Sequence, residues 1–120
     1  RRQRQMCIRD RNIYRKEGVA EEDQTIKPVS YSVVKHGIMG LTKYLATYWG
    51  KKGVRVNTLC PASLQNGQDP EFIEKLSALV PMGRMSRPDE YPATVLYMLS
   101  DASSYMTGAT VVLDGGRTIW

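Results

Sequence analysis

Residues 28–60 are predicted to form a helix followed, after a short turn, by a strand, and this order restricts the chain to few folds. Apolar side chains recur there at spacings of four and three residues, which is the period of an amphipathic helix. The apolar stripe consists of Val34, Ile38, Leu41, Leu45 and Tyr48. Gly50 is expected to end the helix, and residues 54–60, rich in β-branched side chains, are expected to form a strand. A helix that leads into a strand through a short glycine-containing turn is half of a parallel crossover unit.

The rest of the chain continues this alternation of helices and strands, after a polar loop predicted over residues 12–27. Asp69 and Pro70 are typical of a helix start, and an apolar side follows at Phe72, Ile73, Leu76, Leu79 and Val80. A third helix is predicted near residues 86–100, with a kink or a late start at Pro92. It is expected to bury Tyr91, Val95, Met98 and Leu99.

Residues 109–113 are predicted to form the second strand. Strands of a parallel sheet need neighbours and cover on both faces, so three helices with two strands indicate only part of a domain. We therefore expect residues 12–120 to be a partial domain of α/β class, the carboxyl-terminal part of a doubly wound parallel sheet with flanking helices.

Charge and composition exclude several classes of protein for this chain of 120 residues. Of the formal net charge of +5, residues 1–11 carry +4, so the folded body lacks the basic footprint of a nucleic-acid binder. This short basic tail is interpreted as non-native and set apart from the fold. No apolar run reaches the ~20 residues of a membrane span. Two cysteines, Cys7 and Cys60, favour a reducing cytoplasm, and a single histidine predicts no metal site.

Tyr31 and Lys35 lie four residues apart, one turn along the same face of the first helix. A cation held ~4 Å from a phenol oxygen favours the phenolate by ~4 kcal/mol at an effective dielectric constant of ~20. Such a pair can give and take a proton near neutral pH. A second pair with this spacing, Tyr48 and Lys52, spans the helix-ending glycine, so its geometry is not expected to be held. By spacing alone, Tyr31 and Lys35 are better interpreted as ordinary helix residues.

The order of several further motifs changes that interpretation. From about residue 26 to residue 120, the chain resembles the carboxyl-terminal half of the short-chain dehydrogenase/reductase family. The motifs that carry the resemblance are Tyr31-x-x-x-Lys35 with Gly37 and Gly40, Arg55-Val56-Asn57 leading into Cys60-Pro61, Pro81-Met82-Gly83-Arg84 followed by Pro88-x-Glu90, Ser103 to Gly108, and Asp114-Gly115-Gly116.

The resemblance implies a Rossmann-like fold and hydride transfer between NAD or NADP and a small alcohol or carbonyl substrate. It assigns the acid/base role to Tyr31, and it assigns to Lys35 both the nicotinamide ribose hydroxyls and the support of the phenolate. It places Pro61, Ala62 and the backbone of Leu64 along the nicotinamide. It also implies a mobile substrate lid over residues 69–80, and a homodimer or homotetramer without nucleic acid or membrane.

Three departures from the family pattern limit what this chain is expected to do. Ala62-Ser63 replaces the usual glycine after the proline, which is expected to alter the backbone approach to the nicotinamide slightly. No serine precedes Ser30, so the family's catalytic serine is missing. No Gly-x-Gly-x-x-Gly phosphate turn is present either. The chain made alone is therefore expected to be inactive.

Other functions stay open at the level of the sequence. A binding or scaffold protein could keep this fold without its chemistry, and an epimerase could use the same Tyr31 and Lys35 pair on a sugar nucleotide. A nucleic-acid module would rest on residues 1–11 alone. A second stripe on the first helix suits close approach of another helix, because glycine is otherwise unfavourable there. It is formed by Val33, Gly37, Gly40 and Tyr44.

Overall fold

The computed structural model describes residues 16–24 and 28–119. The predicted tail at residues 1–11, Cys7, and residues 12–15 and 25–27 of the predicted loop lie outside these residues. The described elements are η1 (Glu21–Asp23), α2 (Val29–Trp49), η2 (Gly50–Lys52), β1 (Thr58–Pro61), α3 (Pro70–Ser77), η3 (Pro88–Glu90), α4 (Pro92–Leu99), η4 (Asp101–Ser103) and β2 (Thr110–Leu113).

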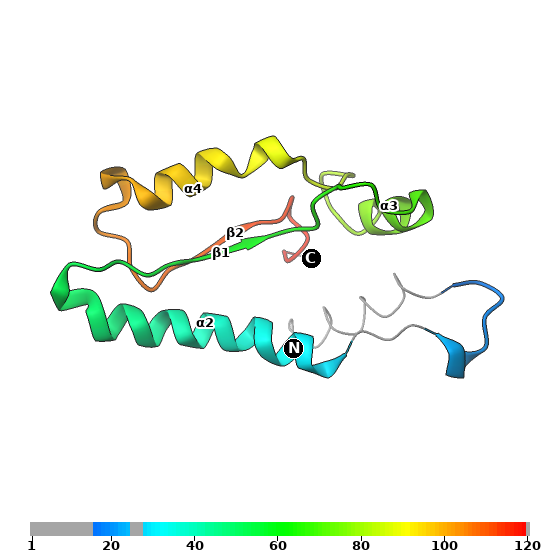
Figure 1. The fold of residues 1–120 in the computed structure, drawn as a ribbon. Coiled ribbons are helices and arrows are strands. Elements are labelled where there is room, and N and C mark those ends of the chain that lie inside the picture. Colours follow the sequence, from blue (N-terminus) through cyan, green and yellow to red (C-terminus); the bar gives the residue numbers. More distant parts are fainter. Residues whose placement is uncertain (1–15, 25–27, 120) are drawn as a thin grey trace.

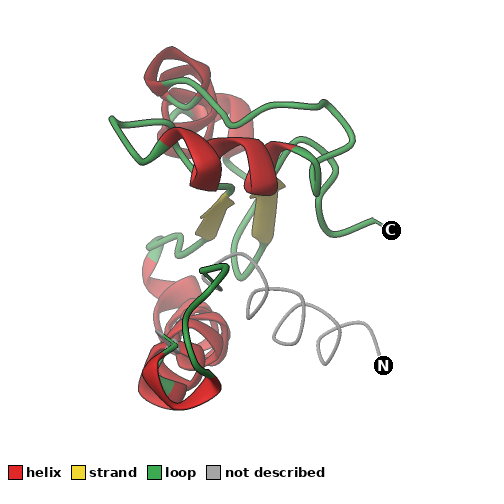
Figure 2. Cartoon of the chain, turned by 90° about the vertical axis from the view of Figure 1, so that its right-hand side faces the viewer, coloured by secondary structure: helices red, strands yellow, loops and turns green. Residues whose placement is uncertain are grey.

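The two strands form a parallel sheet, as the order of helix and strand predicts. Thr58 pairs with Thr110, and the register continues to Pro61 opposite Leu113. The helices α2 and α4 lie on opposite sides of this sheet, and both run antiparallel to the strands (Figures 1 and 2). The described part of the chain is thus a helix–sheet–helix sandwich of α/β class.

The helix α2 ends at Trp49 with Gly50 as its C-cap, as predicted. Gly50 keeps a right-handed helical conformation, and the chain continues through η2. Gly53 is the residue in the left-handed conformation, with φ of 77°, and its N–H donates to the carbonyl of Gly50 at 3.1 Å. Glycine adopts this conformation without the steric cost that a side chain would bring, so Gly53 is the residue that turns the chain.

The strand predicted over residues 54–60 is shorter and lies further along the chain. Val56 donates its N–H to the Thr107 hydroxyl at 3.1 Å and accepts from the N–H of Gly108 at 2.7 Å. Asn57 donates its side-chain amide to the carbonyl of Met106 at 2.9 Å. The backbone of this segment is therefore bonded to the loop before β2, and the regular ladder begins only at Thr58.

The helix predicted to begin at Asp69 and Pro70 is confirmed. The Asp69 carboxylate accepts a hydrogen bond from the N–H of Glu71 at 2.8 Å, which caps α3, and Pro70 occupies its first turn. The apolar side of this helix faces inward, with Leu76 only 1% exposed. Leu76 packs with Met85 in a cluster that also includes Phe72, Ile73 and Leu79.

The late start predicted for the third helix is also confirmed, because η3 precedes an α4 that begins at Pro92. Its predicted buried side is only partly correct. Tyr91 and Met98 are half-buried, whereas Val95 is 39% exposed and Leu99 is 76% exposed. A sheet of two strands is narrower than the apolar side of this helix and cannot cover all of it.

The apolar side of α2 is likewise only partly covered by the sheet. Its buried residues are Thr42 and Ala46, and Ala46 lies against Gly108, where an added Cβ would sit 3.5 Å from the Ala46 Cβ. In the predicted stripe only Leu45 is half-buried; Val34, Ile38, Leu41 and Tyr48 remain exposed. Among the described residues, no helix is long and apolar enough to cross a membrane.

Candidate functional site

Tyr31 and Lys35 lie in the first turns of α2 and face the same way. The Lys35 ammonium lies 5.4 Å from the centre of the Tyr31 ring, within reach of a cation–π interaction. The N–H of Tyr31 donates to the carbonyl of Pro28 at 3.1 Å, so the phenol belongs to the ordered start of the helix. Tyr31 is 46% exposed.

The second pair with the same spacing has almost the same geometry, contrary to the sequence-based expectation. The Lys52 ammonium lies 5.7 Å from the centre of the Tyr48 ring. The reason is that Gly50 does not end the helical path, since η2 continues it through Lys52. The local arrangement of tyrosine and lysine therefore does not distinguish the two pairs, and only their place in the fold can.

The two pairs lie at opposite ends of the sheet. Thr42 of α2 contacts Thr58 of β1, and the helix runs antiparallel to the strand (Figure 1). Tyr31 precedes Thr42 by about 16 Å of helix, and Pro61 follows Thr58 by about 10 Å of strand. Tyr31 and Lys35 thus lie toward the carboxyl ends of the strands, where open α/β sheets bind their ligands. Tyr48 and Lys52 lie toward the amino ends.

The chain leaves β1 at Pro61 and continues beside β2 for one more residue. Ala62 donates its N–H to the carbonyl of Leu113 at 2.9 Å, which extends the ladder beyond the strand. No described residue other than glycine has a positive φ, so Ala62 has a backbone conformation that any residue can adopt. The alanine in place of the family's glycine therefore does not strain this turn.

Leu64 follows in an isolated parallel bridge with Ser86. In this bridge the N–H of Gln65 donates to the Ser86 carbonyl at 2.9 Å, and the Ser86 N–H donates to the carbonyl of Ser63 at 3.2 Å. Successive backbone groups of an extended segment point to opposite sides, so the N–H of Leu64 faces away from Ser86. Within residues 28–119 it donates to no acceptor, and Leu64 is 37% exposed.

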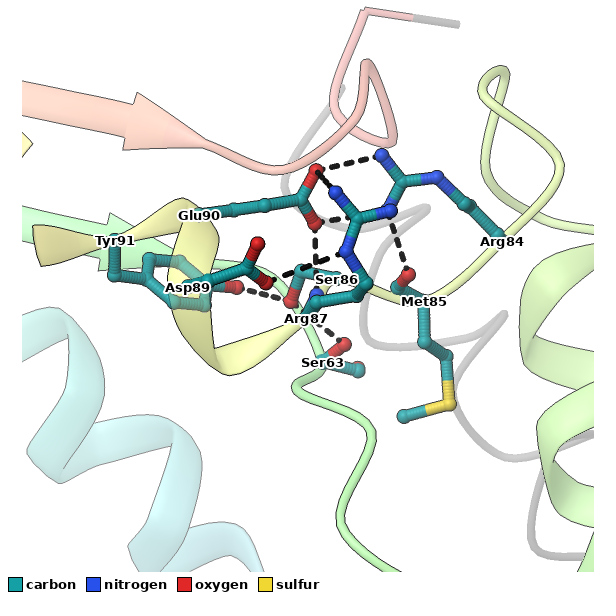
Figure 3. Close-up of polar contacts among 8 residues, drawn as sticks. All are labelled: Ser63, Arg84, Met85, Ser86, Arg87, Asp89, Glu90 and Tyr91. Atoms are coloured by element: carbon teal, nitrogen blue, oxygen red, sulfur yellow. Dashed lines mark hydrogen bonds and ion pairs between the residues drawn. The ribbon is translucent and has the colours of Figure 1, made fainter. Parts of the chain in front are cut away.

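A charged cluster after α3 supports this bridge, and sequence reasoning gave its members no role (Figure 3). The Arg84 guanidinium donates two hydrogen bonds to the Glu90 carboxylate, at 2.8 and 2.6 Å. Glu90 also accepts from the N–H of Arg87 at 2.7 Å. The Arg84 contact, followed by the bond from the Arg87 backbone, lowers the pKa of the Glu90 carboxyl to about 2. In the sequence, Arg84 and Glu90 were noticeable only as members of the motif Pro81-Met82-Gly83-Arg84 followed by Pro88-x-Glu90.

The remaining sequence candidates stay outside this site or lack reactive partners. The His36 side chain is exposed, as expected, and its Nδ1 lies 2.8 Å from the carbonyl of Ser32 on its own helix. Cys60 is a half-buried free cysteine in β1. The helix α3, which corresponds to the expected lid, lies beyond the carboxyl ends of the strands (Figure 1).

The comparison with protein families identifies the class to which this arrangement belongs. A family model described as enoyl-(acyl carrier protein) reductase matches residues 17–118. The chain belongs to the short-chain dehydrogenase/reductase family, as the resemblance implied. Its α/β fold, with a parallel sheet and flanking helices, is that of the Rossmann-like members.

Named relatives are similar over most of this chain but over a minor part of their own. Galactitol 2-dehydrogenase (L-tagatose-forming) of Cereibacter sphaeroides is 40% identical over 97 residues, which cover 76% of this chain and 38% of the relative. NADH-dependent L-xylulose reductase of Ambrosiozyma monospora is 41% identical over 101 residues, 77% of this chain and 37% of the relative. The chain therefore spans less than two fifths of the length of these two relatives.

A solved structure gives the same picture. A short-chain dehydrogenase from Leptospira borgpetersenii with bound NAD+ superposes with a TM-score of 0.75 at 33% identity. The superposition covers 85% of this chain and 40% of that one.

Proposed function

We propose that this chain supplies the nicotinamide end of the active site of an NAD- or NADP-dependent oxidoreductase that interconverts an alcohol and a carbonyl compound. The observation that carries the proposal is the placement of Tyr31 and Lys35, rather than Tyr48 and Lys52, toward the carboxyl ends of the two strands. Family membership and the names of the relatives support it.

The donors of this end fit the nicotinamide half of the cofactor. Lys35 forms no ion pair with any described residue, so its ammonium can donate to ribose hydroxyls. The N–H of Leu64, which faces away from its own bridge, suits the carboxamide oxygen. Pro61 is exposed at the strand end, and Ala62 follows it, so both can line the nicotinamide. A bound nicotinamide supplies the acceptor or donor of the hydride.

Tyr31 and Lys35 then handle the proton. In the direction of oxidation, the Tyr31 oxygen takes the proton of the substrate hydroxyl as the carbonyl forms; in the direction of reduction it returns that proton. The positive charge of Lys35 favours the phenolate that accepts the proton. A phenylalanine at position 31 cannot transfer this proton, whereas the groups of Lys35 and Leu64 that bind the cofactor would remain.

The proposal extends to the surroundings of this site. Residues 12–120 would be one part of a Rossmann-like domain, and α3 would serve as the substrate lid. The free, half-buried Cys60 supports a reducing, cytoplasmic setting. The exposed stripe of α2 supports a homodimer or homotetramer, because a Cβ added at Gly37 or Gly40 would meet nothing within 4 Å.

A chimera provides an assay with a defined substrate. Residues 28–119 would replace the aligned segment of the Cereibacter galactitol 2-dehydrogenase, and galactitol oxidation would be followed with the Tyr31→Phe variant. We expect turnover to fall by on the order of 10²–10⁴ while cofactor binding survives. The matched control is Tyr48→Phe, which removes the same hydroxyl from the second pair and should leave turnover unchanged. Turnover of Tyr31→Phe within a factor of two of the parent chimera would refute the acid/base role.

Product analysis separates the proposal from its two rivals. A scaffold protein would leave the parent chimera inactive although it folds and binds the cofactor. An epimerase would change the configuration of a sugar nucleotide without net reduction of the cofactor. Net NADH formation that depends on Tyr31 supports the dehydrogenase.

A further inference from the structure

The backbone of residues 62–65 has no regular secondary structure of its own, yet hydrogen bonds hold it at several points. The N–H of Ala62 donates to the carbonyl of Leu113, and the carbonyl of Leu64 accepts from the Gln68 side chain at 2.8 Å. The other contacts come from Ser86 and Tyr91, two residues that no motif brought forward. Both are half-buried and lie on either side of η3 (Figure 3).

The hydroxyls of Ser86 and Tyr91 contact each other, and together they reach two consecutive carbonyls. The Ser86 hydroxyl lies 3.2 Å from the carbonyl of Ser63. The Tyr91 hydroxyl lies 3.4 Å from the carbonyl of Ala62. Only two hydroxyl protons serve these three contacts, so two arrangements satisfy them. Either Ser86 donates to Ser63 and Tyr91 donates to Ser86, or Ser86 donates to Tyr91 and Tyr91 donates to Ala62.

The backbone of Ser86 adds the bridge on the same side. Its N–H donates to the carbonyl of Ser63 at 3.2 Å, and its carbonyl accepts from Gln65 at 2.9 Å. The backbone N–H and the hydroxyl of Ser86 thus both lie within hydrogen-bond distance of the Ser63 carbonyl. These contacts fix the orientation of the peptide units on both sides of Leu64, and its N–H therefore points to the opposite side.

The charged cluster keeps Ser86 and Tyr91 at the correct separation. Arg84 binds Glu90 through two hydrogen bonds, and its Nη1 also donates to the carbonyl of Met85 at 3.1 Å. The Glu90 carboxylate caps the N–H of Arg87. Residues 84–90 are thereby closed into a compact turn, with Ser86 inside it and Tyr91 directly after it.

We propose that Ser86 and Tyr91 are positioning residues, which hold the backbone of residues 62–65 so that the N–H of Leu64 faces the nicotinamide carboxamide. The inference rests on the proposed function for the identity of the ligand. The loop-holding role of Ser86 and Tyr91 is independent of the proposed function, because the two residues hold the loop in the free protein as well.

The test uses the complete protein and measures NAD+ affinity by calorimetry together with backbone amide exchange. Tyr91→Phe and Ser86→Ala should each weaken binding by about threefold to tenfold, the range that loss of one hydrogen bond gives. The double variant should be little worse than either single variant, because the two hydroxyls act through one contact. Ser86→Thr, which keeps the hydroxyl, should restore most of the affinity.

Amide exchange provides a readout that does not depend on the cofactor. In the free protein, the N–H groups of Gln65 and Ser86 should exchange several times faster in Tyr91→Phe, while the thermal midpoint stays close to that of the parent. The matched controls are Tyr97→Phe and Ser104→Ala. Within residues 28–119 neither of these side-chain hydroxyls forms a hydrogen bond, so both variants should behave as the parent.

The possible failures are distinguishable. If the parent binds no NAD+ or NADP+ but exchange at Gln65 responds to Tyr91→Phe, the proposed function is wrong and the loop-holding role stands. If the parent binds the cofactor and both variants bind within a factor of two of it, with unchanged exchange at Gln65, the positioning role is wrong.

Discussion

The side-chain oxygens of Thr42 and Thr58 lie 2.5 Å apart in the buried contact between α2 and β1. Thr42 also donates to the carbonyl of Ile38 at 2.9 Å, so its proton is used within the helix and Thr58 supplies the proton of the shared contact. This pair is a buried point of contact between α2 and β1. The helix runs antiparallel to the strand, so Tyr31 and Lys35, which precede Thr42, lie toward the carboxyl end of β1 (Figure 1).

Removal of one member of this pair should be costly, because both side chains are buried. In the complete protein, Thr42→Val should lower the free energy of unfolding by about 1–3 kcal/mol, since the Thr58 hydroxyl loses its partner. The measurement is denaturant unfolding. Thr47→Val is the control: this exposed threonine donates to its own helix at 3.0 Å but contacts no strand. Equal effects of the two substitutions would contradict the role of the contact.

Loss of the positive charge at Lys35 should have two effects. Lys35→Met should weaken cofactor binding by about tenfold or more, because a charged donor is lost. It should also move the basic limb of the pH–rate profile to higher pH, because the phenolate loses a neighbouring cation. Lys52→Met, at the other end of α2, is the matched control. A fall in turnover with unchanged affinity and unchanged pH profile would contradict this dual role.

The depressed pKa of Glu90 predicts a defined pH dependence of stability. Its pKa falls from 4.5 to about 2 in the folded chain, so the folded state binds this proton less readily than the unfolded state. The stability that the carboxylate contributes is therefore fully present above pH 4.5 and is lost as the pH falls toward 2. Glu90→Gln should be less stable than the complete parent protein at neutral pH, and the difference should narrow across that window.

Thermal unfolding at several pH values measures this narrowing. Glu74→Gln is the control, because its exposed carboxylate forms no ion pair with any described residue. The prediction is contradicted if the difference in thermal midpoint between Glu90→Gln and the parent stays constant from neutral pH down to 2. The lowered pKa of Glu90 would then not be a source of stability.

The open stripe on α2 predicts the effect of a bulky side chain on assembly. Within the described chain a Cβ at Gly40 meets nothing within 4 Å, so Gly40→Leu should leave the fold intact. It should reduce the molar mass measured by light scattering on the complete protein, because the close approach of a second helix is blocked. Gly50→Leu, also open but outside the stripe, should not change the mass. An unchanged mass for Gly40→Leu would rule out this face as the interface.

The chain of 120 residues made alone should be poorly folded and inactive. Large apolar side chains of α2 and α4 are exposed, among them Val33 at 65% and Leu96 at 67%. The described sheet has two strands, each with one unpaired edge, and such edges favour aggregation. Calorimetry should detect no cofactor binding at millimolar concentration, and the thermal transition should be broad or absent. A sharp cooperative melt with sub-millimolar affinity would show instead that this part is self-sufficient.

Much of the local structure could be predicted from the sequence. The spacing of apolar residues located α2, and the Asp69-Pro70 pair located the start of α3. The parallel sheet followed from the order of helix and strand. These features depend on residues within a few positions of one another, so the physical rules of caps, turns and periodicity apply to them directly.

The choice between the two tyrosine–lysine pairs, in contrast, could not be made from local spacing. Both pairs have nearly the same distance from ammonium to ring, 5.4 Å for Lys35 and 5.7 Å for Lys52, because helical geometry sets that distance wherever the spacing occurs. Motif order favoured Tyr31 by resemblance. The structural reason appeared only with the contact of Thr42 and Thr58, which join across 16 positions of sequence.

The sequence by itself determined the elements, their order and the residues able to carry a proton. Tertiary structure alone decided three things: which pair meets the carboxyl ends of the strands, which side of α2 is buried, and that Ser86 and Tyr91 hold the turn after β1. The reason is physical. Local geometry follows from bonds and contacts within one or two helical turns, whereas these outcomes depend on hydrogen bonds and packing between segments that meet only when the chain folds.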